Sequence, residues 1–93
     1  MKIQLLRGTY GYDVAYTIED NCVYVGRSTY DLAYRIDGNQ ILVGRTYEVA
    51  YTIDDKYVMV GRSNTEVAYR IDLDDKKVYI GRYGYDVAYR MYW

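Results

Sequence analysis

An almost unchanged phrase recurs along the chain, and this repetition limits the possible folds more than any other feature. "VAYTIEDNCVYVGR" begins at Val14, and related phrases begin at Leu32, Val49 and Val67. The VAY-type triplets, including a fifth at Val87, are spaced 18, 17, 18 and 20 residues apart. A period of this length indicates one small structural unit per repeat, and such units bury their apolar faces by packing against their neighbours.

Each repeat contains two short apolar segments separated by a polar turn. The first segment has the form [DE]-V-A-Y-[TR]-I and the second the form V-x-V-G-R, with turns such as "EDN", "DGN" and "DDK" between them. Asp, Asn and Gly accept the left-handed backbone that tight hairpins need. No segment shows the apolar spacing of a helix. Each repeat of about 18 residues is therefore predicted to form a β-hairpin.

The pairing within each hairpin follows from the requirement that large apolar residues share one face. A turn at Asp20 and Asn21 places Ile18 opposite Val23. The fourth turn, "DLDDKK", is longer by two residues, which preserves the face. We expect Val14 to lie on this face too. The full set of predicted pairs is Ile18–Val23, Tyr16–Val25, Ile36–Ile41, Tyr34–Val43, Ile53–Val58, Tyr51–Val60, Ile71–Val78 and Tyr69–Ile80.

The opposite face combines small residues with larger neighbours. The same register sets Ala15 opposite Gly26 and repeats this small pair in the other units. Glycine in a strand often marks a close approach of another group, so either tyrosine rings cover these glycines or another chain, sheet or ligand lies on them. The larger pairs beside them are Thr17–Tyr24, Arg35–Leu42, Thr52–Met59 and Arg70–Tyr79. The candidate interaction surface on this face comprises Tyr24, Met59, Ala68, Arg70, Tyr79, Arg35 and Leu42.

Residues 1–93 are predicted to form a single all-β domain. The repeats, with one further strand at each end, give about ten strands in an antiparallel meander. Pairing of the first strand with the last would remove both edges, so we predict a closed barrel or a strongly curled sheet. The alternative is a β-solenoid with one unit per coil.

The Gly-Arg pairs at the ends of the units are each followed by an acidic residue. We expect ion pairs across these connections: Arg27–Asp31, Arg45–Glu48, Arg62–Glu66, Arg82–Asp86 and a first copy, Arg7–Asp13. The connection between Val43 and Val49 is one residue shorter than the others, which predicts a different loop type or a bulge there.

The composition argues against an enzyme or a cofactor protein. The chain has no His and a lone Cys22, which excludes the usual general base and His/Cys metal sites. Asp72, Asp74 and Asp75 lack the glycine and the closing Glu of an EF-hand loop, so we interpret them as a solvated turn without a metal. No cofactor, and no catalytic residue, is predicted.

Tyrosine and arginine dominate what remains, with fifteen Tyr in 93 residues. Both side chains are typical anchors of interfaces. We therefore predict a non-enzymatic structural or protein-interaction module that binds copies of itself, and, as an alternative, a lectin-like or small-ligand-binding barrel with carbohydrate as a possible partner. The net charge of −1 argues against nucleic acid. No signal peptide or membrane segment is recognised, so a cytoplasmic location without membrane contact is expected.

Overall fold

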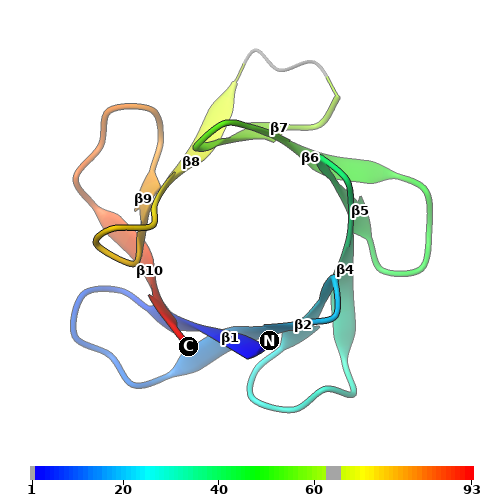
Figure 1. The fold of residues 1–93 in the computed structure, drawn as a ribbon, viewed down its shortest axis with the longest axis horizontal. Coiled ribbons are helices and arrows are strands. Elements are labelled where there is room, and N and C mark those ends of the chain that lie inside the picture. Colours follow the sequence, from blue (N-terminus) through cyan, green and yellow to red (C-terminus); the bar gives the residue numbers. More distant parts are fainter. Residues whose placement is uncertain (1, 63–65) are drawn as a thin grey trace.

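The computed structural model describes residues 2–62 and 66–93, and these form a closed antiparallel barrel of ten strands (Figure 1). Each strand pairs with its neighbours along the chain, and β1 pairs with β10. The predicted closed meander is confirmed, and the solenoid alternative is wrong. The strands are β1 (Lys2–Arg7), β2 (Val14–Glu19), β3 (Cys22–Val25), β4 (Leu32–Asp37), β5 (Gln40–Val43), β6 (Val49–Asp54), β7 (Tyr57–Val60), β8 (Val67–Asp72), β9 (Lys77–Ile80) and β10 (Val87–Tyr92).

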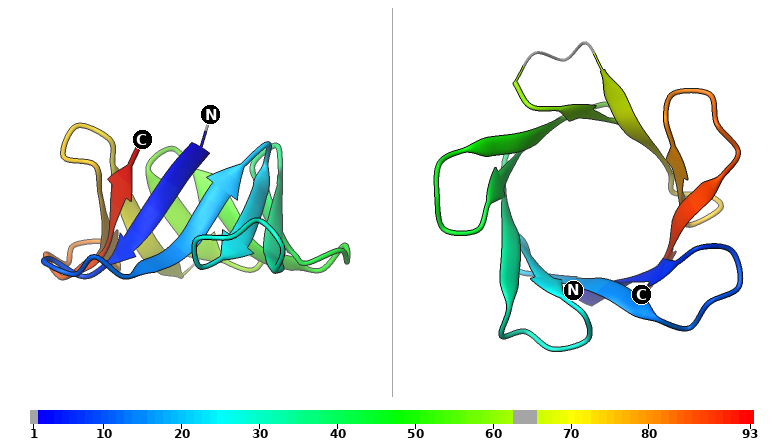
Figure 2. Two further views of the ribbon diagram at one scale, coloured as in Figure 1. Left: turned by 90° about the horizontal axis from the view of Figure 1, so that it is seen from below. Right: turned by 180° about the vertical axis from the view of Figure 1, so that it is seen from behind.

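The two ends of the barrel differ. Short turns and both termini lie at one end, the turn end, while long loops extend outward from the other, the rim end (Figure 2). We call these loops the rim loops. They comprise residues 8–13, 26–31, 44–48, 61–66 and 81–86, of which 63–65 lie outside the described part of the chain. With the rim loops, the molecule is a disc with extents of 33 × 33 × 17 Å.

The predicted register within the hairpins is confirmed. At the first turn, Asp20 and Asn21 have φ values of 54° and 64°, which is the left-handed backbone that a two-residue hairpin turn requires. The longer fourth turn preserves the face, because Asp72 pairs with Lys77 across it. All eight predicted pairs occur: Ile18–Val23, Tyr16–Val25, Ile36–Ile41, Tyr34–Val43, Ile53–Val58, Tyr51–Val60, Ile71–Val78 and Tyr69–Ile80.

A β-bulge at the alanine of every VAY-type triplet corrects one expectation. In the pairing of β2 with β1, Tyr16 lies opposite Leu5 and Val14 lies opposite Leu6. Ala15, between them, has no partner of its own and is therefore the extra residue of the bulge. The extra residue reverses the alternation of side chains. Val14 therefore lies on the outer face of the barrel rather than with Tyr16, and the prediction for this residue was wrong. The bulge recurs at Ala33, Ala50, Ala68 and Ala88.

The glycines after the strands serve a purpose that differs from the predicted one. Gly26 lies just beyond β3 with φ of 74°, and its N–H donates to the Ala15 carbonyl at 2.8 Å. No atom lies within 4 Å of the position that a Cβ would occupy, so no tyrosine ring covers this glycine. The same holds for Gly8, Gly44, Gly61 and Gly81. These positions need glycine because the chain enters the rim loop through a left-handed conformation.

The rim loops share one closing bond and differ in their other contacts. In the first loop the N–H of Arg7 donates to the Asp13 carbonyl at 3.0 Å, and the other four loops repeat this bond. Of the predicted ion pairs, Arg7–Asp13 is the one that forms among the described residues. In the shorter loop 44–48, Thr46 donates to the Val43 carbonyl through both its N–H and its hydroxyl, which confirms a different loop type.

Substitutions at Gly26 separate a conformational requirement from a steric one. Gly26→Ala is expected to lower the free energy of unfolding by about 1–2 kcal/mol, because alanine resists the left-handed backbone. Gly26→Asn is expected to cost less, because asparagine tolerates this conformation and the space around the Cβ is open. Urea denaturation measures both. A larger loss of unfolding free energy in Gly26→Asn than in Gly26→Ala would contradict the conformational explanation. It would indicate instead that a neighbouring group lies close to Gly26.

Candidate functional site

Five tyrosines, one from each hairpin, form a closed ring inside the barrel. The ring centroids of neighbouring tyrosines are 5.9 to 6.4 Å apart, and their planes are inclined by 52° to 71°. Such tilted contacts between aromatic rings are favourable because the edge of one ring meets the face of the next. The members of this tyrosine ring are Tyr16, Tyr34, Tyr51, Tyr69 and Tyr89.

An apolar chamber of about 220 Å³ lies between the tyrosine ring and the turn end. Apart from the five tyrosines, its wall consists of aliphatic side chains, two from each hairpin. In the first hairpin these are Ile18 and Val23, one pair nearer the turn than Tyr16 and Val25. The aliphatic residues of the wall are Leu5, Ile18, Val23, Ile36, Ile41, Ile53, Val58, Ile71, Val78 and Met91.

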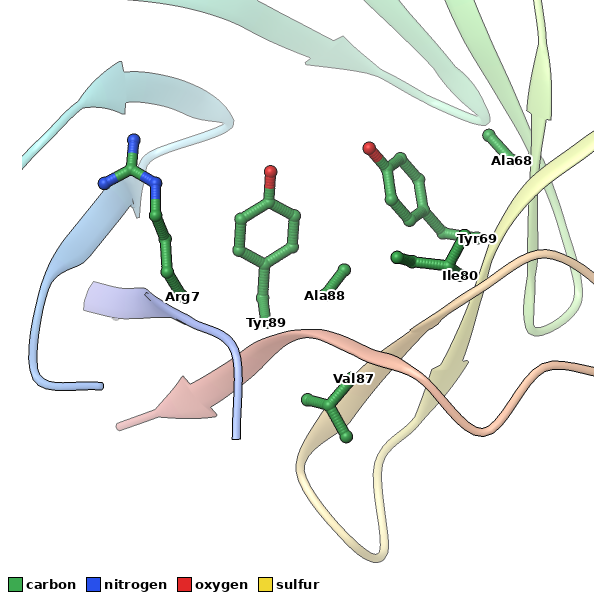
Figure 3. A pocket seen from close by; sticks show the side chains of 7 residues that line it. All are labelled: Arg7, Ala68, Tyr69, Ile80, Val87, Ala88 and Tyr89. Atoms are coloured by element: carbon green, nitrogen blue, oxygen red, sulfur yellow. The ribbon is translucent and has the colours of Figure 1, made fainter. Parts of the chain in front are cut away.

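The rim-end side of the tyrosine ring is a wider and less uniform mouth. Val25, Val60 and Ile80 stand there on the inner face, and they are 43%, 40% and 51% exposed. A groove of about 450 Å³ lies on one side of this mouth, and Figure 3 shows Arg7 beside Tyr89 on its wall. Arg7 pairs with Tyr89 where the other hairpins place an aliphatic residue, so it breaks the five-fold repeat.

Burial and crowding raise the pKa of three tyrosines of the ring. Burial in the barrel, with neighbouring Tyr69 and Tyr16, raises the pKa of Tyr89 to about 12. Burial likewise raises the pKa of Tyr34 and of Tyr51 above the ordinary value. These hydroxyl groups therefore stay protonated at neutral pH and can donate hydrogen bonds.

The outer face, which we predicted as an interaction surface, is largely covered by the chain itself. Leu42 and Met59 are only 3% and 4% exposed, so another chain cannot reach them on the folded domain. Thr17 is fully buried and Thr52 is 5% exposed on the same face. Tyr24, Arg35, Arg70 and Tyr79 are half-buried. Ala68 is a bulge residue that lines the groove at the mouth (Figure 3).

A row of anchoring side chains explains this burial. The residue after each VAY-type triplet donates a hydrogen bond to a rim-loop carbonyl and so holds the loop against the barrel wall. These bonds are Thr17 to Gly26 at 2.6 Å, Arg35 to Gly44 at 2.8 Å, Thr52 to Gly61 at 2.7 Å, Arg70 to Arg82 at 3.0 Å and Arg90 to Gly8 at 3.2 Å. The sequence pattern showed this position as [TR] but did not reveal its role.

Arginine side chains on the outer face also stack on tyrosines. The Arg70 guanidinium lies 4.6 Å from the ring centroid of Tyr79, and that of Arg35 lies 5.7 Å from Tyr47. These cation–π contacts hold the arginine side chains against tyrosines of the same domain. The structure thus brings the predicted residues Arg70 and Tyr79 together, in an intramolecular contact.

Six tyrosines on the rim loops are instead open to solvent. Their exposed fractions are 88% for Tyr10, 83% for Tyr12, 92% for Tyr30, 82% for Tyr47, 81% for Tyr83 and 87% for Tyr85. Four of them lie on loops 8–13 and 81–86, which are neighbours because β1 pairs with β10. Aromatic side chains this exposed are unusual on a small domain, and they make the rim loops the best candidate surface.

The described residues offer little for metal chemistry. Residues 2–62 and 66–93 contain no group of three His, Cys, Asp or Glu side chains that could hold a metal ion. In the fourth turn, the Asp72 carboxylate accepts a hydrogen bond from the Asp75 N–H at 3.2 Å. In that same part of the chain there is no helix that could cross a membrane.

The raised tyrosine pKa values predict how stability depends on alkaline pH. Between pH 10 and about 12 the unfolded state has lost the Tyr89 proton while the folded state keeps it, so stability falls as the pH rises through this window. Tyr89→Phe is expected to make this fall shallower in urea denaturation across that range. Ile53→Val, which removes a chamber methylene and no hydroxyl, should lower stability equally at every pH. If stability falls with pH as steeply in Tyr89→Phe as in the wild type, the fall is not caused by the raised pKa of Tyr89.

The comparisons with known proteins agree with this architecture. Residues 3–92 match the family described as "6-fold beta flower protein". No curated protein and no solved structure is significantly similar to the chain. The ten strands form five hairpins around the barrel, with β10 and β1 as the fifth, where the family description counts six units. The chain belongs to the 6-fold β-flower protein family, and its own flower has five units.

Proposed function

We propose that this domain is a non-enzymatic protein-interaction module that associates with a second copy of itself through its rim end. The observation that carries the proposal is the set of six rim-loop tyrosines, each at least 81% exposed. Tyrosine supplies a large contact area at a small cost in side-chain entropy and is enriched at the centres of interfaces. The family and the barrel fold fit a small non-enzymatic domain.

The rim end has the size and composition of an interface. A face about 33 Å across offers on the order of 800 Å², which is what each partner buries in a standard complex. Its centre holds the exposed apolar residues Val25, Val60 and Ile80, and the tyrosines stand around them. An apolar centre within a more polar surround is the usual anatomy of a contact between proteins.

Charge favours a second copy as the partner. The formal net charge is −1, so two copies repel one another only weakly. Four of the five rim loops also have an arginine at their second residue and an acidic residue at their end, as in Arg27 and Asp31. A two-fold arrangement of rim against rim makes every contact reciprocal, so an arginine of one copy that meets an acidic residue of the other forms two equivalent ion pairs.

The proposal moves the predicted self-association from the outer face to the rim. Leu42 and Met59 are buried within the domain and cannot anchor a partner. Tyr24 and Tyr79 remain half-buried and could extend the contact only at its periphery. The rim tyrosines, rather than the outer face, therefore supply the exposed aromatic area through which a tyrosine-rich domain could self-associate.

Replacing two neighbouring rim tyrosines tests the proposal. We expect the wild-type domain to show a concentration-dependent dimer in sedimentation velocity, and Tyr83→Ser with Tyr85→Ser to weaken it at least tenfold. The matched control is Tyr92→Ser, because Tyr92 is 65% exposed at the turn end. A wild-type domain that stays monomeric at high concentration would refute self-association, and equal effects of the two variants would refute the rim as the surface.

A carbohydrate partner stays a second prediction, because the same rim tyrosines could stack on sugar rings and neighbouring carboxylates could bind their hydroxyl groups. A glycan array probed with the wild-type domain distinguishes this function from self-association. Weak binding to several glycans that is lost in the rim variant would support it, and the absence of any signal would remove it. The cytoplasmic location and the absence of nucleic-acid and membrane partners also stay predictions.

A further inference from the structure

We infer that the chamber inside the barrel binds a small, neutral, largely apolar molecule that carries one hydrogen-bond acceptor, such as an alcohol or aldehyde of six to eight carbons. This inference concerns the turn-end side of the tyrosine ring and does not depend on the proposed contact at the rim. It rests on the wall, the volume and the accessibility of the chamber, and on the position of the only polar groups in it.

The wall of the chamber favours an apolar occupant. Ten of its fifteen residues are aliphatic and the other five are the tyrosines of the ring. A water molecule in a protein cavity needs two to four polar partners, and the aliphatic wall supplies none. Water held against this wall is therefore displaced easily by an apolar group, which strengthens the binding of such a group.

The chain leaves part of this wall accessible. Ile18, Ile36, Ile53 and Ile71 in the chamber are only half-buried. The valines opposite three of them, Val23, Val58 and Val78, are buried. A small domain gains stability by burying its aliphatic side chains, so an accessible aliphatic interior indicates a space kept open for a ligand.

The volume sets the size of the ligand. A protein cavity of about 150 Å³ lined by apolar residues is large enough to bind benzene, whereas sites for drug-sized molecules span about 300–1,000 Å³. The chamber, at about 220 Å³, lies between these limits. A chain of six to eight carbons or a substituted benzene ring fits this range.

The polar groups determine the chemistry of the ligand's head. Only the tyrosine hydroxyls offer hydrogen bonds in the chamber, and Figure 3 shows those of Tyr69 and Tyr89 at the free ends of their side chains. No residue of the chamber wall carries a charge, and Arg7 lines the mouth rather than the chamber. An anionic head would therefore be buried without a counter-ion, which is costly, so a neutral acceptor is favoured over a carboxylate.

The experiment is a titration of the folded domain, labelled at the isoleucine methyl groups, with 1-hexanol and separately with hexanoate at pH 7. We expect saturable NMR shifts at Ile18, Ile36, Ile53 and Ile71 with 1-hexanol, and at least tenfold weaker binding of hexanoate. Ile80 is the internal control because it lies at the mouth, beyond the tyrosine ring. Shifts that do not saturate, shifts centred on Ile80, or equal binding of hexanoate would each overturn the inference.

A pair of matched variants locates the site independently. Val58→Phe fills the chamber and is expected to weaken 1-hexanol binding at least tenfold. Val60→Phe makes the same change on the same strand and the same face, but at the mouth, and is expected to leave binding unchanged. If Val58→Phe fails to fold, Ile53→Trp, which enlarges a half-buried side chain of the chamber wall and also fills the chamber, is measured instead. Full binding in the folded chamber variant would overturn the inference.

The two proposals can fail separately. The titration is repeated on the variant with Tyr83→Ser and Tyr85→Ser, whose substitutions lie outside the chamber. Binding of 1-hexanol in this variant supports the chamber whether or not the wild-type domain dimerises. Loss of binding there would overturn the claim that the chamber acts without the rim.

Discussion

The hydrogen bond from each glycine N–H to the alanine carbonyl of its hairpin is the contact on which the rest of the structure depends. It occurs five times, at 2.7 to 2.9 Å, once at every transition from strand to rim loop. The glycine turns the chain outward and the alanine forms the bulge that reverses the alternation of side chains. Because of this reversal, the first residue of each triplet lies on the outer face while the tyrosine after the alanine points into the barrel.

The number of repeats sets the dimensions of everything inside. The diameter of a barrel grows with its number of strands, and ten strands bring the ring centroid of each inward tyrosine within 6.4 Å of those of its two neighbours. A sixth hairpin, as the family description counts, would widen the barrel and separate tyrosines in equivalent positions. The volume of the chamber is thus a consequence of the number of repeats.

The hairpins could be predicted from the sequence because two facts constrain them together: side chains alternate along a strand, and the turn residues accept left-handed backbone. Ile18 and Val23 therefore pair as expected. The bulge at Ala15 could not be predicted, because alanine suits a regular strand as well and only the loop connection requires the extra residue. Because the loops could not be predicted, the candidate interaction surface was also assigned to the wrong face. Leu42 and Met59 were correctly placed on the outer face, but their burial depends on tertiary packing that the repeat pattern does not specify.

The tyrosine ring separates two surfaces that can act without obstructing one another. Contact between rim ends would cover the mouth, with Val25 and Val60, yet the chamber lies beyond the ring toward the short turns and the termini (Figure 2). A ligand that enters from the turn end meets the aliphatic wall first and the tyrosine hydroxyls last. Its apolar part therefore exchanges water for Ile and Val side chains before its polar head accepts a hydrogen bond from a tyrosine hydroxyl. For the ligand proposed above, this order favours entry with the polar head first and the apolar tail toward the turn end.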